Sequence, residues 1–225
     1  MENRTDKLKV YGPEGVSQVT DGFEMAYDLD YGFRSKHHGE AVAPRKYAGF
    51  NANVIDLDEP VFFNNGDLKI TAFKVIHEPI EPALGYKFEY KGRSLVISGD
   101  TSYSENVIKA SEGVDVLFHE AQANHMVDII ENFALENGAK LRAKLMADIK
   151  TYHTTLIEAA DIANKADVKK LVFYHLTPAP RNYLTELMFV RGVNEVRKNW
   201  VLSEDGTMIV LPVESDQIIV DTMQN

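Results

Sequence analysis

The chain of 225 residues contains no cysteine, so disulfides, thiolate nucleophiles and cysteine-ligated zinc sites are excluded. No apolar run approaches the ~18 residues of a membrane-spanning helix, and we expect no membrane partner. Basic side chains are the minority, 24 against 34 acidic ones, which gives a formal net charge of −10. This charge repels phosphate backbones as a whole, although a local basic groove would survive it. Nucleic acid is therefore disfavoured as a partner rather than excluded.

The amino-terminal residues also lack the features of a targeting segment. No apolar stretch follows Met1 in residues 2–7, so we expect no secretory signal and a cytoplasmic location. The length and the 44% apolar fraction are those of a folded globular protein. They predict one domain that spans residues 1–225.

Hydrophobic patterning predicts an α/β unit. A strand at 8–11, a turn at 12–15 and a helix at 16–30 come first, and residues 31–58 are predicted to be a long loop with at most one strand. Beyond residue 60 the patterns predict strands at 61–63, 70–76, 85–90, 94–98, 114–118, 171–174 and 207–211. The predicted helices there are 124–150, 155–166 and 183–199, and the second opens with the capping pair Thr155-x-x-Glu158.

Four apolar runs end in, or within two residues of, side chains that can bind a metal ion: His77, Asp100, His119-Glu120 and His175. In α/β proteins, ligands collect beyond the carboxyl ends of strands, so these residues are expected to converge. Each has a structural alternative when taken alone. A single histidine after a strand is commonly a structural residue, and Asp100 could cap the next helix.

Taken together, His77, Asp100 and His175 predict a metal site. Two imidazoles and one carboxylate provide three protein ligands and leave one position for water, which is the arrangement of catalytic zinc. We expect zinc, with manganese or iron as alternatives. Such an ion lowers the pKa of its bound water towards ~7 and makes hydroxide available.

His153 is the expected proton donor, because it directly precedes a predicted helix amino terminus and would lie near the metal. Asp100 and Glu120 complete the predicted catalytic set, Glu120 as the carboxylate that orients an imidazole. The alternative for His153 is a surface residue beside a helix cap. His125 is predicted to be structural, and His119 either structural or an orienting group.

Four segments together resemble the metallo-β-lactamase superfamily, and the nearest branch is that of ribonuclease Z and the arylsulfatase-like hydrolases. The segments are Leu8–Gly15, Gly85–Thr101, Phe118–Ala121 and Tyr174–Pro178. The resemblance implies an αββα sandwich. It also implies that His77 and His175 are metal ligands, that Asp100 bridges two metals, and that His153 lies near the scissile bond.

The chain lacks the family's His-x-His-x-Asp-His signature, so the resemblance implies an amino-terminally truncated sandwich. Four metal ligands would be missing, and a two-metal site cannot form within one copy. Sheet edges exposed by the missing strands favour a homodimer.

The expected function is metal-dependent hydrolysis of phosphate, sulfate or carboxylic esters, lactones included, by a metal-activated water. Two alternatives stay open: a ribonuclease Z-like endonuclease for tRNA 3′ ends, and a non-catalytic fragment whose metal site needs a partner chain. An iron oxygenase ranks last, because His77 and Asp100 lie far apart in sequence. The net charge and the short stretch 24–57 favour a small ester over tRNA.

Overall fold

A computed structural model describes residues 4–223, and the chain divides into two compact units, residues 1–62 and 63–225. The organisation of residues 1–225 as one domain stays a prediction. No helix in the described range is both long and apolar enough to cross a bilayer.

The first unit is a long helix on a small parallel sheet. Strand β1 (Leu8–Gly12) pairs with β2 (Phe50–Val54), and α1 (Val16–His38) and the 3₁₀ helix η1 (Arg45–Tyr47) lie between them in sequence. The predicted helix therefore continues eight residues further, so the loop predicted for 31–58 is wrong over residues 31–38, whereas β2 is the one strand allowed for in that stretch. Glu24 joins α1 to the sheet, because its Oε1 accepts hydrogen bonds from the Phe50 N–H and from Lys7.

The second unit is organised around a seven-stranded sheet in the order β3-β4-β5-β6-β7-β8-β9. The strands are β3 (Val61–Asn64), β4 (Leu68–His77), β5 (Ile80–Tyr90), β6 (Arg93–Ile97), β7 (Val116–Gln122), β8 (Lys170–Thr177) and β9 (Trp200–Leu202). Strands β4, β5 and β6 are antiparallel in succession, whereas β6 to β9 are parallel. Strands β4, β6, β7 and β8 thus run in the same direction, and their carboxyl ends meet at one edge of the sheet.

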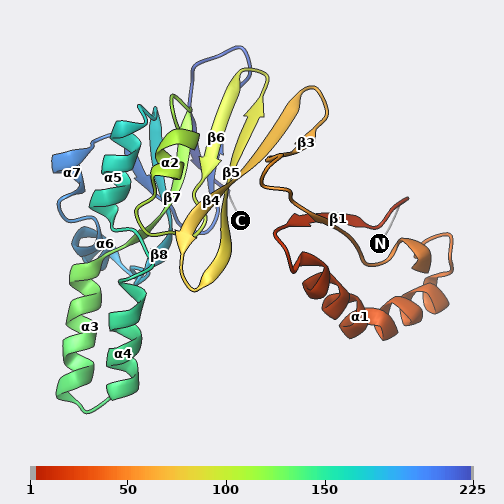
Figure 1. Cartoon of the computed structure of the whole chain (residues 1–225), viewed down its shortest axis with the longest axis horizontal. Helices are drawn as coiled ribbons and strands as arrows, with labels where there is room; N and C mark the ends of the chain where they lie inside the picture. Colours follow the sequence, from red (N-terminus) through yellow and green to blue (C-terminus); the bar gives the residue numbers. More distant parts are fainter. Residues whose placement is uncertain (1–3, 224–225) are drawn as a thin grey trace. The chain divides into compact units, whose positions relative to one another are not determined.

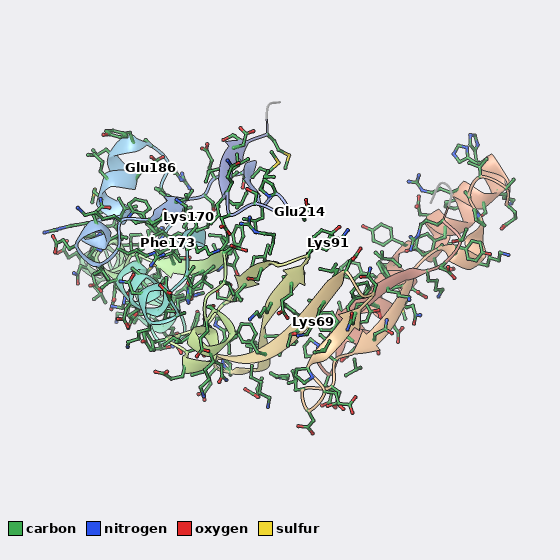
Figure 2. The ribbon with its side chains drawn as sticks, turned by 90° about the horizontal axis from the view of Figure 1, so that it is seen from above. Lys69, Lys91, Lys170, Phe173, Glu186 and Glu214 are labelled. Carbon is green, nitrogen blue, oxygen red and sulfur yellow. The ribbon has the colours of Figure 1, made fainter. Side chains whose placement is uncertain are left out.

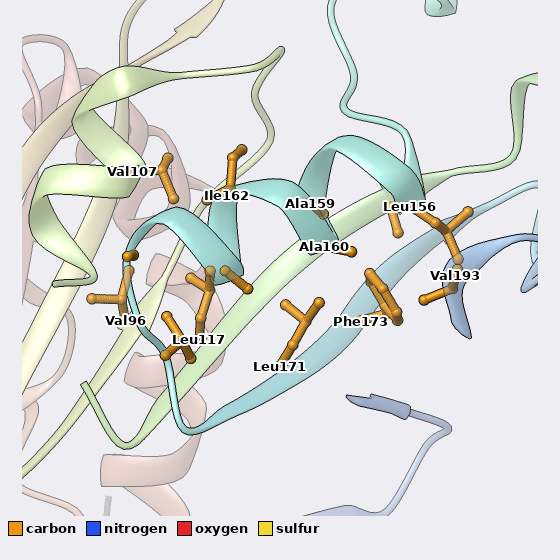
Figure 3. Packing of buried hydrophobic residues seen from close by; sticks show 14 of the residues in the cluster. Val96, Val107, Leu117, Leu156, Ala159, Ala160, Ile162, Leu171, Phe173 and Val193 are labelled. Atoms are coloured by element: carbon orange, nitrogen blue, oxygen red, sulfur yellow. The ribbon is translucent and has the colours of Figure 1, made fainter. Parts of the chain in front are cut away.

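Helices α2 (Glu105–Ala110) and α5 (Leu156–Lys165) cover one face of this sheet (Figure 1). Ala159 and Ala160 of α5 are fully buried, and these small side chains let the helix approach the strands closely. Leu171 and Phe173 of β8 meet the helix from the sheet side (Figure 3). The predicted start of α5 is confirmed, because Thr155 and Glu158 form a reciprocal capping box.

The remaining helices follow the strands. Helices α3 (Asn124–Glu136) and α4 (Lys140–Ile149) form an antiparallel hairpin, where the sequence predicted one mostly helical stretch. The helix predicted at 183–199 is two, α6 (Tyr183–Phe189) and α7 (Val193–Val196), because the chain between them passes through Gly192 at φ 86°. Strands β10 (Thr207–Val210) and β11 (Ile219–Thr222) form a hairpin, of which the sequence predicted only the first strand. The α/β fold class is confirmed.

A buried ion pair lies at the amino ends of β6 and β7. The Arg93 Nε donates to Asp115 Oδ2 at 3.0 Å, and both side chains are less than a tenth exposed. The same guanidinium donates to the carbonyls of Pro212, Ser215 and Gln217, which ties the segment before β11 to the sheet.

Candidate active site

The structure brings together most of the residues that the sequence singles out. His77 ends β4, Asp100 follows β6, His175 lies near the end of β8, and His153 lies in the loop before α5. The ring of His153 is 5.4 Å from that of His77 and 5.6 Å from that of His175, measured between centroids. His175 Nε2 is 3.5 Å from Asp100 Oδ2. These four side chains form a row along the edge where the strands end.

Glu120 orients His153 through a hydrogen bond. It lies on β7 with a fully buried side chain, and its Oε1 accepts hydrogen bonds from His153 Nδ1 at 3.1 Å and from the Thr154 N–H at 2.8 Å. Because the carboxylate can only accept, Nδ1 carries a proton in both the neutral and the protonated ring, and Nε2 is available to another partner. Burial of the ring opposes its charge, but the hydrogen bond and charge of Glu120, together with the charge of Asp100, outweigh it. The pKa of His153 is therefore raised above its ordinary value.

His77 is oriented in a similar way by the backbone. Its Nδ1 donates to the Tyr152 carbonyl at 2.9 Å, which fixes the tautomer and leaves the Nε2 lone pair free. A hydrogen bond from the second ring nitrogen to a carbonyl is the usual support of a metal-ligating histidine. The Tyr152 ring packs edge-on against the imidazole, with centroids 5.0 Å apart.

His175 occupies a β-bulge. Glu120 pairs with Tyr174 and Ala121 pairs with Leu176, so His175 is the extra residue of β8, with φ 47°. A bulge redirects a side chain, and left-handed backbone at a residue other than glycine is costly. The sequence predicted that β8 ends at Tyr174, whereas the strand continues through this bulge to Thr177.

The turn that carries Asp100 depends on Gly99. Gly99 has φ 68°, and a Cβ there would lie 2.4 Å from the Leu84 carbonyl oxygen, so no other residue fits without movement. Tyr174 lies close to Ser98 and Gly99 of the same turn, and burial raises the pKa of its phenol to about 12. Asp100 does not cap the next helix, because Ser104 is the N-cap of α2.

The donors in this row have the chemistry that a borderline metal such as zinc prefers, imidazole nitrogen and carboxylate oxygen. Their number falls short: among residues 4–223 no group of three or more His, Asp or Glu side chains is arranged to hold a metal ion. Only His175 and Asp100 are in direct contact. The ligand set of His77, Asp100 and His175 stays a prediction.

The other histidines lie outside the row. His119 is fully buried, its Nδ1 bonds to the Glu120 carbonyl, and burial lowers its pKa. His125 on α3 bonds through Nε2 to the Met188 carbonyl, which agrees with its predicted structural role. His37 and His38 are exposed at the end of α1.

Three supporting residues were not predicted from the sequence. Tyr152 and Tyr174 directly precede His153 and His175, and Thr154 follows His153. Tyr152 and Thr154 support the site through backbone hydrogen bonds, and Tyr174 lies close to the turn that carries Asp100. The one sequence signal that could have identified them is that each is adjacent to a candidate histidine.

Comparison with known proteins agrees with this geometry. Residues 2–176 match the family model described as beta-lactamase superfamily domain. The ribonuclease Z of Mycolicibacterium gilvum is 26% identical over 171 residues, which are 76% of this chain and 54% of that protein. The chain thus spans about half the length of such curated relatives.

Two solved structures share the fold. The metallo-β-lactamase fold protein YhfI of Bacillus subtilis is 18% identical, with a TM-score of 0.56 over 89% of this chain and 63% of its own. Zinc-bound PqqB of Methylobacterium extorquens is 14% identical, with a TM-score of 0.50 over 88% of this chain and 60% of its own. The chain therefore belongs to the β-lactamase superfamily and has the metallo-β-lactamase fold.

Proposed function

We propose that the chain carries part of the active site of a metal-dependent hydrolase that cleaves phosphate, sulfate or carboxylic esters, lactones included. The observation that supports this best is the row His77–His153–His175 with Asp100 at one edge of the sheet. Imidazoles beside a carboxylate, at the carboxyl ends of parallel strands, are suited to binding a polar group and moving a proton.

His153 is the proton donor in this proposal. Glu120 holds Nδ1 and stabilises the protonated ring, so Nε2 can give its proton to the oxygen that leaves as the ester bond breaks. Glu120 itself is buried and serves as a positioning residue. Asp100 and His175 bind and orient the reacting group from the opposite end of the row.

Metal dependence is proposed from the donor types and from the family. Zinc is the first choice and manganese or iron the alternatives; one of the structures with this fold is zinc-bound. When bound, such an ion would supply an activated water at neutral pH. His175 and Asp100 are its first candidate ligands and His77 the third. Because three donors are not yet together among residues 4–223, further ligands from another segment or chain form part of the proposal.

Metal content and ester hydrolysis test the proposal together. We expect the purified chain, dialysed and measured by plasma mass spectrometry, to hold about one equivalent of zinc, manganese or iron. Turnover on a panel of phosphate, sulfate and carboxylic esters should vanish with a chelator and return with the metal. His153→Ala should lower kcat about 10²- to 10⁴-fold without loss of metal. Unchanged turnover in His153→Ala, or turnover that resists chelation, would refute the proposal.

A second candidate is cleavage of tRNA 3′ ends, because the curated relatives are named ribonuclease Z. The net charge of −10 disfavoured nucleic acid, and these names favour it. An RNA-binding chain would lose affinity steeply as salt rises, whereas hydrolysis of a small neutral ester would change little.

A third possibility is a chain that becomes catalytic only with a partner, and a homodimer is the form we expect. Native mass spectrometry with and without zinc distinguishes the cases. A metal-dependent dimer supports completion by a second copy, and a monomer that holds its metal and hydrolyses esters contradicts it.

A further inference from the structure

A cleft of about 770 Å³ opens beside the candidate active site. Its walls come from the end of β8, the loop that leads into α6 and the loop after β9. His175 lies in the wall, so a molecule in the cleft reaches the residue that contacts Asp100. A volume of this size holds a small molecule rather than a folded polymer.

The lining of the cleft also includes apolar side chains. Leu176, Pro180 and Leu202 line it, next to Tyr174. These side chains can contact the apolar part of a ligand, and the charged side chains of the lining can recognise its polar group.

The rim carries more negative than positive charge. Glu186 on α6 (Figure 2) and the adjacent pair Glu204 and Asp205 provide three carboxylates, and Arg181 provides the single guanidinium. Within the described part of the chain none of these four side chains forms an ion pair or a side-chain hydrogen bond. All four charges are therefore free to act on a ligand, and three of them attract a cation.

We propose that this cleft binds the non-reacting part of a small ester that carries an amino or quaternary ammonium group. This rests on the proposed function, because the ester bond would face His175 while the cation lies at the acidic rim. At physiological salt the screening length of about 8 Å is comparable to the span of a small ligand, so the rim charges act together. The same charges repel a chain of phosphates, so this cleft is poorly suited to binding RNA.

Binding of unreactive probes tests the cleft independently of catalysis. Titration calorimetry on the full chain would compare benzyltrimethylammonium, benzyl alcohol, phenylacetate and a short oligoribonucleotide. We expect benzyltrimethylammonium to bind most tightly. In the double variant Glu204→Gln, Asp205→Asn its dissociation constant should rise about two- to tenfold, since each exposed charge contributes modestly.

Two matched variants make the test specific. Arg181→Gln removes the opposing charge, so it should leave cation binding unchanged or strengthen it, and weaken phenylacetate. Glu112→Gln removes one negative charge at an exposed position outside the cleft, against two in the double variant, and should change nothing. Equal effects of Glu112→Gln and the rim variants would overturn the proposal, as would tighter binding of phenylacetate or the oligoribonucleotide. If the cation binds as expected but no ester is hydrolysed, the proposed function fails and the cleft remains a binding site.

Discussion

Replacing Asp115 by asparagine should destabilise the chain strongly while leaving the candidate active site intact. The substitution keeps the shape of the side chain but removes the charge opposite Arg93, where both side chains are less than a tenth exposed. Removal of one partner from a buried pair typically costs ~3–5 kcal/mol. Arg93 keeps three carbonyl acceptors, so we expect the lower end, about 3 kcal/mol.

Urea unfolding followed by the fluorescence of Trp200, the single tryptophan, measures this effect in the unit that contains the pair. The midpoint should fall with little change in the m-value. Asp67→Asn is the matched control, because Asp67 pairs with Lys91 at the surface and should cost less than about 1 kcal/mol. The pair lies at the amino ends of β6 and β7, so kcat should be unchanged well below the unfolding temperature. Equal destabilisation by the two variants would refute the reasoning.

Three further predictions follow from single contacts. Burial alone would raise the pKa of Asp115, but hydrogen bonds from Lys169, Ser94 and Arg93 outweigh it and hold that pKa below its ordinary value. The stability from this carboxylate is therefore complete above pH about 3.9 and is lost as the pH falls through the lower folded pKa, so Asp115→Asn should flatten the acid limb of unfolding curves. Thr155→Ala should cost about 1 kcal/mol in urea titrations through loss of the capping box, whereas Thr155→Ser should cost much less. Gly99→Ala should cost about 2 kcal/mol or more, and displacement of Asp100 should lower turnover in the fraction that stays folded; an alanine variant with wild-type stability contradicts the geometry.

Local chemistry in the sequence predicted the parts of the fold that depend on local interactions. The capping pair Thr155-x-x-Glu158 located the start of α5, and the alternation around the hairpins located β4 to β6. The end of α1 was missed because its last turns carry little amphipathic pattern, so the helix resembles a loop in sequence. The three-residue strand β9 is set by pairing with β8 and has no signal of its own.

The convergence of His77, Asp100 and His175 was predictable because apolar runs end in or near them, and His153 was expected nearby because it precedes a helix amino terminus. The hydrogen bonds and contacts that these residues make were not predictable. The Glu120–His153 hydrogen bond joins residues 33 positions apart, and the bulge at His175 comes from the pairing of β7 with β8. Both depend on long-range register, which a single sequence does not encode in any local pattern.

The bulge at His175 sets stability against activity at one position. Left-handed backbone costs an L-residue about 1–2 kcal/mol, and glycine avoids this cost, so His175→Gly should release part of it. The same change deletes the imidazole that meets Asp100 and faces the cleft. Selection of variants for heat resistance alone would therefore favour glycine at position 175, and the selected variants would lack the imidazole that the proposed active site needs. Engineering for higher stability should therefore keep His175 and introduce stabilising substitutions at the opposite end of the sheet.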